Sequence, residues 1–377
     1  MSFTKTALFF LYILLLAAVF YFAFICYRAA GLYHFVKDTT KGWEGQLHRI
    51  DGILGYAPIP GTGGIETVPG GEKVPVWYNS DGFRTPPGDK DSGSGKKPRM
   101  LFLGCSFTFG SGCRAEKTFP FLIGEKMDGS VINAGVNSYG FSNMVLRARE
   151  LVPKYKPDIV FFQVSPWLFE RAVAMYRPTP YWTLPMPYYA MVNGRNEIQP
   201  PPFMTGIFDV PIAGFRKTPA GLSDFLQFAV KVAVPLYLRD DFSRCWTGIR
   251  MAVGLIPRPN TSKNGLIRDV ILEMNAICKE NGAKLAVIFL GDRDISKKIN
   301  ISHENRDVIM IDAEKPLWDA LQMKTMTDYS MAYQHIAGDP PKVVDRHPND
   351  KAHAIIADAV YRALQEYMLK MKAKKQT

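Results

Sequence analysis

After residue 98, short continuous apolar runs alternate with longer stretches in which apolar residues recur at helical spacing. Unbroken apolar runs are typical of parallel strands that are covered on both faces. The runs predict strands at Met100–Gly104, Ser130–Asn133, Asp158–Val164, Lys284–Leu290 and Val308–Ile311. The periodic stretches predict helices at Phe119–Lys126, Ser142–Lys154, Gly265–Asn281, Pro316–Leu321 and Lys351–Met371. Strands that alternate with helices indicate an α/β fold with a doubly wound, mainly parallel five-stranded sheet.

The N-terminus follows a different pattern. Ala7–Tyr27 contains neither a charge nor a helix breaker, and it is long enough to span a bilayer. The alternative is a cleaved signal peptide, whose apolar region usually has about 7–15 residues before a small-x-small cleavage site. This run ends instead in "FAFICYRAAG". We therefore favour an uncleaved transmembrane anchor over residues 1–30. Basic residues on both sides, such as Lys5 and Arg28, leave its orientation undecided.

The rest of the chain divides into three parts. Residues 31–98 form a turn-rich juxtamembrane segment that ends in a flexible loop, "PPGDKDSGSGKKP". Residues 99–372 form the α/β domain. Within it, residues 171–262 break the alternation and are rich in Pro, Tyr, Trp and Phe, so we interpret them as an insertion. The insertion either covers the site or binds an extended substrate, or it is a surface excursion packed against its own domain or a membrane.

Composition narrows the class of partner. The chain has a formal net charge of +11, which would suit an acidic partner, but its basic residues are spread along the chain and no nucleic-acid module is recognisable. We therefore expect no nucleic-acid partner. No Cys or His spacing resembles a metal site. Among the five cysteines, Cys105 and Cys113 either pair across the loop between them or remain a small buried residue and a free thiol.

The stretch "FLGCSFTFGSG" places Ser106 at the carboxyl end of a predicted strand, where sites form in α/β folds. Serine is a weak nucleophile unless a base lies within hydrogen-bond reach and a third group orients that base. Of six histidines, His347 stands out because Asp345 precedes it by two residues. In extended chain these two side chains point to the same side. Ser106 by itself would fit a simple turn, but the three residues together predict a catalytic set.

Four blocks of the chain resemble those of the SGNH (GDSL-like) hydrolases, in particular a membrane-anchored bacterial branch that includes glycan O-acetyltransferase-like proteins. The blocks are "YNSDGFR", "FLGCSFTFGSG", "VINAGVNSYGFSN" and "DRHPNDKAHAIIA", and the resemblance covers about 51–367. It implies a flavodoxin-like sheet in which Ser106 is the nucleophile. His347 would be the general base and then the acid, and Asp345 the orienting carboxylate. Cys105 replaces a family aspartate that is not catalytic.

The resemblance also shows two departures, both among the groups that stabilise the oxyanion. Family members use the N–H of the nucleophile, a glycine of the second block and an asparagine of the third. Here Ser138 takes the place of the glycine, and Trp167 falls at the asparagine position. Losing one such donor costs about a hundredfold to a thousandfold in rate. Alternatively, Ser165 or Asn137 supplies the missing donor.

The resemblance implies an enzyme that cleaves or transfers an acyl ester, with acetyl favoured, on an envelope carbohydrate or a small ester. It places the protein in the inner (cytoplasmic) membrane with its catalytic domain on the periplasmic side, where a membrane acyl-donor protein would be a plausible partner. We expect no cofactor, because the triad performs the proton transfers. The alternative is a weak or inactive glycan-binding or scaffold protein, which Trp167 favours and the Ser106, Asp345 and His347 set opposes.

Overall fold

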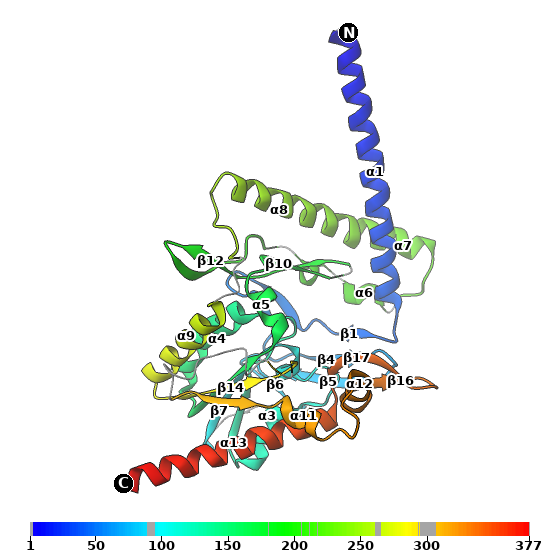
Figure 1. Ribbon diagram of the computed structural model, residues 1–377. Helices are drawn as coiled ribbons and strands as arrows, with labels where there is room; N and C mark the ends of the chain where they lie inside the picture. The colour runs from blue at the N-terminus through cyan, green and yellow to red at the C-terminus, as the bar shows by residue number, and fades with distance from the viewer. Residues whose placement is uncertain are drawn as a thin grey trace.

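The structure is a computed structural model that describes residues 3–88, 95–179, 181–204, 206–210, 212–216, 218–260, 265–292, 294 and 307–376. In these residues the central sheet has nine strands in the order β1-β4-β5-β6-β8-β7-β9-β14-β15 (Figure 1). The five parallel strands are β7 (Arg99–Leu103), β8 (Ser130–Asn133), β9 (Ile159–Val164), β14 (Lys284–Phe289) and β15 (Ile309–Asp312). Their spatial order is that of a flavodoxin-like doubly wound sheet, which confirms the predicted core.

Helices cover both faces of the parallel strands, as the unbroken apolar runs predict. One face packs against α4 (Phe141–Tyr155) and α9 (Leu266–Glu280), and the other against α3 (Phe119–Lys126), α11 (Lys315–Asp319) and α13 (Asp350–Gln376). Strand β7 shows the alternation: Leu101 and Leu103 belong to the first cluster, and Met100 and Phe102 to the second. The apolar residues of this strand therefore alternate between the two cores.

The predicted number of five strands is too small, because the segment 31–98 also contributes strands to the sheet. It contributes the antiparallel strands β1 (Gly42–Glu44), β4 (Gly63–Thr67), β5 (Lys73–Tyr78) and β6 (Arg84–Thr85), and β6 joins the parallel half by pairing Arg84 with Asn133. A hairpin of β2 (His48–Asp51) and β3 (Gly55–Pro58) lies beside them. The flexible loop expected near residue 90 falls largely outside the described residues.

The insertion contains two hairpins and a set of helices. The hairpins are β10 (Tyr176–Pro178) with β11 (Thr183–Pro185), and β12 (Tyr188–Val192) with β13 (Arg195–Gln199). The helices are η2 (Ile207–Asp209), α6 (Ile212–Arg216), α7 (Leu222–Phe228), the π-helical turn η3 (Ala229–Ala233) and α8 (Val234–Ala252). Their buried residues form one cluster with α1 and the β2–β3 hairpin, so the insertion packs against its own domain.

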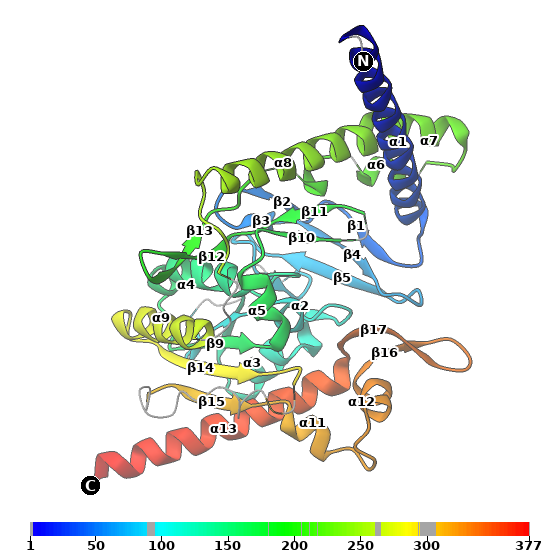
Figure 2. The same cartoon turned by 45° about the horizontal axis from the view of Figure 1, so that its top comes forward.

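The N-terminal helix α1 (Phe3–Lys37) is longer than the predicted anchor, and its N-terminal part projects from the body in Figures 1 and 2. By length and composition it could cross a membrane, although a signal sequence would meet the same criterion. Large apolar side chains from Leu8 to Phe24 are exposed, whereas one face of the helix from Ile25 onwards, with Ile25, Leu32 and Val36, is buried against the insertion. The helix therefore has one free part and one part that belongs to the globular core.

Candidate active site

Ser106 lies where the parallel strand β7 gives way to a single helical turn, α2 (Ser106–Phe109). The turn requires glycine at position 104, because a Cβ there would overlap the side chain of Thr108 and approach Gln163 Oε1 to 2.7 Å. As the first residue of α2, Ser106 has a backbone N–H that no carbonyl of its own helix can accept. Its side chain is almost buried, at 6% exposure. The sequence therefore places the hydroxyl and a free N–H at the same end of the sheet.

Gln163, at the end of β9, holds this turn in place. Its Oε1 accepts hydrogen bonds from the Cys105 N–H at 3.1 Å and from Thr108 Oγ1 at 2.8 Å. Its Nε2 donates to Ser165 Oγ at 2.8 Å and to Cys105 Sγ at 3.3 Å. The residue is buried, so one amide satisfies the polar groups on both sides of Ser106. The sequence analysis missed this residue, because a glutamine within an apolar strand carries no motif.

The structure brings Asp345 and His347 to the same place as Ser106. Both lie on β17 (Lys342–Pro348), the second strand of a hairpin with β16 (Gln334–Ala337). Asp345 Oδ1 accepts hydrogen bonds from His347 Nδ1 at 2.6 Å and from the His347 backbone N–H at 2.9 Å. The His347 ring meets the ring of Phe107, the residue after Ser106, edge-on with 5.9 Å between centroids. The predicted orienting pair is thus formed beside the turn that carries Ser106.

The remaining link of the predicted triad is not closed. In the described part of the chain no hydrogen bond joins Ser106 Oγ to His347, and the contact of the hydroxyl is with Cys105 Sγ at 3.9 Å. Hydrogen bonds between nucleophile and base are often loose when no substrate is bound, and they tighten in the reacting complex. A rotation of the Ser106 side chain towards His347 is the movement that catalysis would require.

The charges of the pair favour an ionised carboxylate and a basic imidazole. Burial lowers the pKa of His347, but the hydrogen bond that its ring donates to Asp345 and the charge of that carboxylate raise it more. The charge of Glu66 adds to the rise, so the net shift of the His347 pKa is upward. Burial raises the pKa of Asp345. The hydrogen bonds that it accepts from His347 lower this pKa by more than burial raises it, so the net shift is downward. Asp345 therefore stays ionised and fixes the proton of His347 on Nδ1.

Glu66 is a second acidic group near the site, and the sequence analysis did not find it. It lies on β4, is buried, and accepts a hydrogen bond from the Gly112 N–H at 2.9 Å. Burial raises its pKa, while the bond from Gly112 and the charges of Arg84 and His347 lower it, leaving a net increase. Nothing in the sequence indicated that β4 would reach this loop. Arg84 itself is wholly buried, and its guanidinium packs over the Phe109 ring.

The stretch around Ser138, which we expected to supply an oxyanion donor, has an unusual backbone. Ser138 has φ +69°, a conformation that favours glycine. The Ser138 hydroxyl interacts with the phenol of Tyr56, and that phenol donates to the Asn137 carbonyl at 2.5 Å. The Asn137 side chain accepts from Ser111 Oγ at 2.9 Å. This bond uses Oδ1 of the Asn137 amide, so the Asn137 Nδ2 and the Ser138 N–H are the donor groups of this stretch.

The third block offers no amide. The Trp167 ring packs against the Phe107 ring with 4.8 Å between centroids. Burial raises the pKa of the Cys105 thiol, but the charge of Arg171 and hydrogen bonds from the Phe107 and Trp167 N–H groups outweigh it and lower that pKa overall. The indole N–H of Trp167 therefore donates to the Cys105 sulfur. Ser165 is fully buried and its Oγ accepts a hydrogen bond from Gln163 Nε2. That Ser165 or Asn137 supplies the missing donor stays a prediction.

The neighbouring cysteines and histidines have structural positions. Cys105 and Cys113 are both buried free thiols, so the pairing considered from the sequence does not occur in the structure. Cys113 Sγ donates to the Pro348 carbonyl at 3.4 Å, which ties the Ser106 loop to the end of β17. His335 lies opposite Asp345 in the hairpin and helps to lower the Asp345 pKa. No group of three or more metal-binding side chains occurs in the described residues.

An apolar cavity of about 300 Å³ borders the loop that contains Asn137 and Ser138. Asn137 and Ser138 form one wall, the last turn of α1 a second, and the insertion a third. Aromatic side chains dominate the lining, and His48 adds an uncharged ring because burial lowers its pKa to about 4. The lining residues of the insertion include Trp182, Leu184, Phe208 and Arg216. If the insertion binds substrate, which was one of the two roles considered for it, this cavity is the space beside Asn137 and Ser138 that it would use.

Comparison with known proteins gives similarity to solved structures only. No family model and no curated protein matches the chain. A lipolytic protein of the G-D-S-L family from Desulfitobacterium hafniense DCB-2 shares 13% identity over 71% of this chain and 99% of its own, with a TM-score of 0.34. TesA shares 11% over 71% and 98%, with a TM-score of 0.36. A catalytic mutant of Axe2, an acetylxylan esterase from Geobacillus stearothermophilus, shares 14% over 72% and 94%, with a TM-score of 0.32. At these values the assignment of function depends on the geometry of the site.

Proposed function

We propose that the protein is an SGNH-type serine esterase or O-acyltransferase. The observation that carries this proposal is the Asp345–His347 pair, hydrogen-bonded at 2.6 Å and packed on Phe107 directly after Ser106. Residues that are about 240 positions apart in the chain meet at the carboxyl end of the parallel strands, where α/β folds place their sites. A structural turn at Ser106 would not need an oriented histidine beside it.

In the proposed mechanism Ser106 Oγ attacks the acyl carbonyl while His347 Nε2 takes its proton. Asp345 holds the Nδ1–H and stabilises the imidazolium that forms. The N–H groups of Ser106 and Ser138 receive the oxyanion, His347 returns the proton to the leaving alcohol, and an acyl-enzyme remains. Water or a sugar hydroxyl, deprotonated by His347, then attacks and releases Ser106. If neither Asn137 nor Ser165 supplies the third donor, we expect a rate about a hundredfold to a thousandfold below that of a complete hole.

The proposed substrate is an acyl ester, with acetyl favoured, on a carbohydrate of the cell envelope. Two features support this proposal: the apolar helix α1, and the aromatic insertion beside the oxyanion loop. We propose a single-pass protein of the inner membrane whose catalytic domain is periplasmic, with a membrane acyl-donor protein as the partner of a transferase. The triad needs no cofactor for these steps. A reporter fused after Thr377 tests the orientation.

Labelling of the full chain in detergent tests the nucleophile. A fluorophosphonate should modify the wild type and Ser111→Ala, a change of the neighbouring serine in the same loop, but not Ser106→Ala. Hydrolysis of p-nitrophenyl acetate should follow the same order and should also be lost in His347→Ala. Equal labelling and equal turnover in wild type and Ser106→Ala would reject the assignment. If the wild type is acylated but hydrolyses slowly, faster release with oligosaccharide acceptors would identify a transferase.

The second candidate is a glycan-binding or scaffold protein with little or no activity. Trp167 favours it, because the indole occupies the place of an oxyanion donor and its N–H is directed to Cys105. An enzyme and a scaffold differ in one measurable respect. Failure of the wild type to react with a fluorophosphonate, together with retained binding of an acetylated oligosaccharide by Ser106→Ala, would support the scaffold.

A further inference from the structure

The helices α7, η3 and α8 form one continuous segment, residues 222–252, which we call the platform helix. Its inner face is apolar and buried in the cluster shared with α1, with Phe228, Val232 and Leu236 among its members. Its outer face is also apolar. Large exposed side chains recur on it at helical spacing: Leu226, Val230, Leu238, Phe242, Trp246 and Ile249. A helix at a water surface normally has a polar outer face, so this one is unusual.

Helix α9 shows the normal pattern in the same protein. Its inner face is apolar, with Val270 and Met274 buried, whereas its exposed positions are Arg268, Asp269, Ala276, Lys279 and Glu280. On the platform helix, by contrast, Val230 is 70% and Phe242 is 69% exposed. Contiguous exposed apolar surface of this kind marks a site of contact with a protein or a membrane. The outer face therefore requires an occupant.

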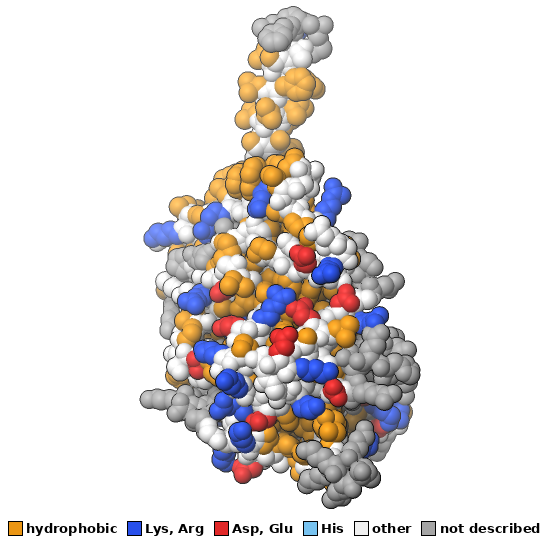
Figure 3. Space-filling view, turned by 90° about the vertical axis from the view of Figure 1, so that its left-hand side faces the viewer, with side chains coloured by type: hydrophobic (Ala, Val, Ile, Leu, Met, Phe, Trp, Pro, Cys, Tyr) orange, Lys and Arg blue, Asp and Glu red, His pale blue; other side chains and the backbone are white. Residues whose placement is uncertain are grey.

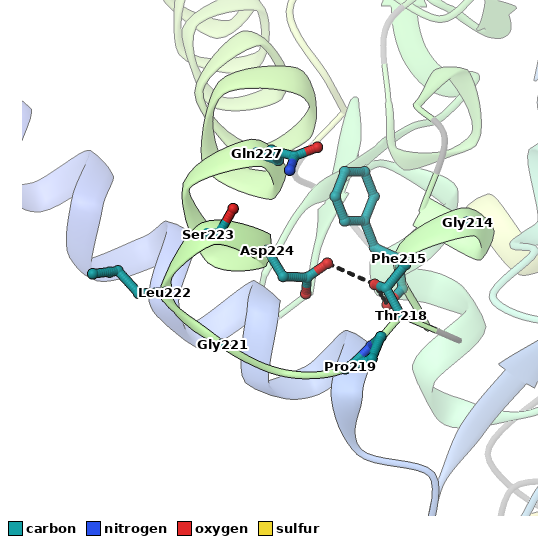
Figure 4. A pocket seen from close by; sticks show the side chains of 9 residues that line it. All are labelled: Gly214, Phe215, Thr218, Pro219, Gly221, Leu222, Ser223, Asp224 and Gln227. Carbon is teal, nitrogen blue, oxygen red and sulfur yellow. Dashed lines mark hydrogen bonds between the residues drawn. The ribbon is translucent and has the colours of Figure 1, made fainter.

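The platform helix is fixed crosswise to α1. Figures 1 and 2 both show α7 and α8 running across α1 instead of along it. Arg28 Nη1 pairs with Asp241 at 2.9 Å, and the Arg28 guanidinium lies 3.9 Å from the centre of the Tyr237 ring. At the other end Lys37 Nζ pairs with Asp224 at 2.6 Å. Figure 4 shows Asp224 at the start of α7, bonded to Thr218 beside an open recess. Two ion pairs thus set the crossing.

The position of this crossing along α1 matches the thickness of a bilayer. Between Lys5 and Arg28, α1 carries no charge. At 1.5 Å per residue, the distance between these two residues along the helix is about 35 Å. The hydrocarbon core of a bilayer is about 30 Å thick. Arg28, the first charge after the apolar stretch, is also the residue that binds the platform helix. If α1 spans a bilayer, the platform helix lies at the level where the hydrocarbon ends.

The charges of the platform helix suit an anionic membrane surface. Its acidic side chains turn inward: Asp224 and Asp241 are paired with α1, and Asp240 is buried against Thr183. The exposed charged residues Lys231 and Arg239 are basic. Figure 3 shows hydrophobic side chains across the top of the body, below α1, with basic residues at their margin. Apolar side chains flanked by cations are typical of helices that lie in a membrane interface.

We propose that the platform helix is an interfacial membrane helix, whose outer face enters the surface of the bilayer that α1 spans and binds its anionic lipids. The two helices together then hold the catalytic domain at a fixed height and orientation. Asn137, Ser138 and the apolar cavity are in this way kept close to the lipid surface on the side of the last turn of α1. This proposal does not depend on the chemistry assigned to Ser106.

Spin labels on the full chain in nanodiscs test the proposal. The exposed cysteines Cys26 and Cys245 are first changed to serine, since the other cysteines are buried. One nitroxide is placed by Phe242→Cys, and the matched control by Ala276→Cys on the exposed face of α9. In nanodiscs of phosphatidylcholine with phosphatidylglycerol, the ratio of collisions with oxygen to collisions with a water-soluble nickel complex should be severalfold higher at position 242 than at 276.

The other outcomes are distinct. Equal ratios at 242 and 276 would overturn the proposal, because the outer face would then be in water. A label at 242 that is shielded from both oxygen and nickel, with spin–spin broadening that grows with protein density, would show that a second copy covers the face and would also overturn it. Labels moved stepwise from 241 to 249 should give oxygen maxima at 242, 246 and 249. A ratio at 242 that falls when phosphatidylglycerol is omitted would confirm the part assigned to Lys231 and Arg239.

Discussion

At the scale of single residues, the basicity of His347 decides when the proposed base can act. Asp345 holds the His347 pKa above its ordinary value of 6.5 despite burial. Only neutral His347 accepts the Ser106 proton, so we expect kcat/KM for p-nitrophenyl acetate to fall as the pH drops through a pKa above 6.5. In Asp345→Asn the raising effect disappears and burial remains, so the acidic limb should move to lower pH while the maximal rate falls. Initial rates across the pH range measure both changes.

The direction of that shift is the informative result. An acidic limb that does not move in Asp345→Asn would mean that another group controls the titration, and Glu66 would be the first to examine. His353 serves as a control, because burial lowers its pKa to about 3 and its Nδ1 accepts a hydrogen bond from the Phe119 N–H. His353 should contribute no limb in this range, whatever His353→Gln does to stability.

Gln163 is a positioning residue whose loss should be measurable in stability and in rate. Gln163→Met keeps the shape of the side chain but leaves the Cys105 N–H and Thr108 Oγ1 buried without their acceptor. Each unsatisfied group costs about 1–3 kcal/mol, so thermal unfolding should begin at a lower temperature. Because the turn that presents Ser106 loosens, kcat should fall while KM changes little.

Ser165→Ala is the matched control for Gln163→Met. It removes only the Ser165 hydroxyl that accepts from Gln163 Nε2. The two bonds that Gln163 Oε1 accepts from Cys105 and Thr108 remain. Its effect on kcat should be clearly smaller. If the two variants lose the same activity, or if Gln163→Met raises KM and leaves kcat unchanged, Gln163 does not act through the nucleophile turn.

At the scale of elements, Asn349 joins the hairpin that carries His347 to its surroundings. Asn349 Nδ2 donates to the carbonyls of Ala332 at 3.1 Å and Gln334 at 3.0 Å, while Oδ1 accepts from the Ala352 N–H at the start of α13. Asn349→Ala removes a helix cap, worth about 1 kcal/mol, and both donors. We expect a lower melting temperature and a lower kcat.

Asn349→Asp separates these two contributions. Aspartate keeps the oxygen that caps α13 but cannot donate to Ala332 and Gln334, so it should recover stability without recovering the full rate. Asn349→Ala does not touch the bond between Asp345 and His347, so the acidic limb of kcat/KM should keep its pKa in that variant, whereas the new carboxylate of Asn349→Asp should move the limb upward if at all. A limb that shifts in Asn349→Ala would show that the asparagine affects the base itself and not the placement of the hairpin.

The elements also show how far the sequence could lead. The five parallel strands were predictable, because each is an unbroken apolar run, and Asp345 and His347 were predictable because their spacing is local. The antiparallel strands were missed, since β4 ("GGIET") and β5 ("KVPVWY") contain glycine or proline and too few alternating positions. Glu66 and Gln163 act on the site through contacts with distant segments. Residues of this kind become visible only when the strand order is known.

At the scale of the whole molecule, α1 unites two functions in one helix. Its first part is free of the body, whereas Ile25, Leu32 and Val36 are buried in the cluster formed with the insertion. Burying each such side chain contributes about 1.5–3 kcal/mol, and a domain of this kind has a net stability of about 5–15 kcal/mol. The second part of α1 therefore contributes a substantial share of the stability of the domain.

This division predicts different results for two truncations. A chain that begins at residue 25 keeps the buried side chains and both ion pairs, Arg28–Asp241 and Lys37–Asp224, so its melting temperature in detergent should be close to that of the full chain. A chain that begins at residue 38 loses all of these contacts and exposes Phe228 and Leu236. It should melt at a much lower temperature or aggregate. If both truncations melt with the full chain, α1 is an anchor only and the crossing does not stabilise the domain.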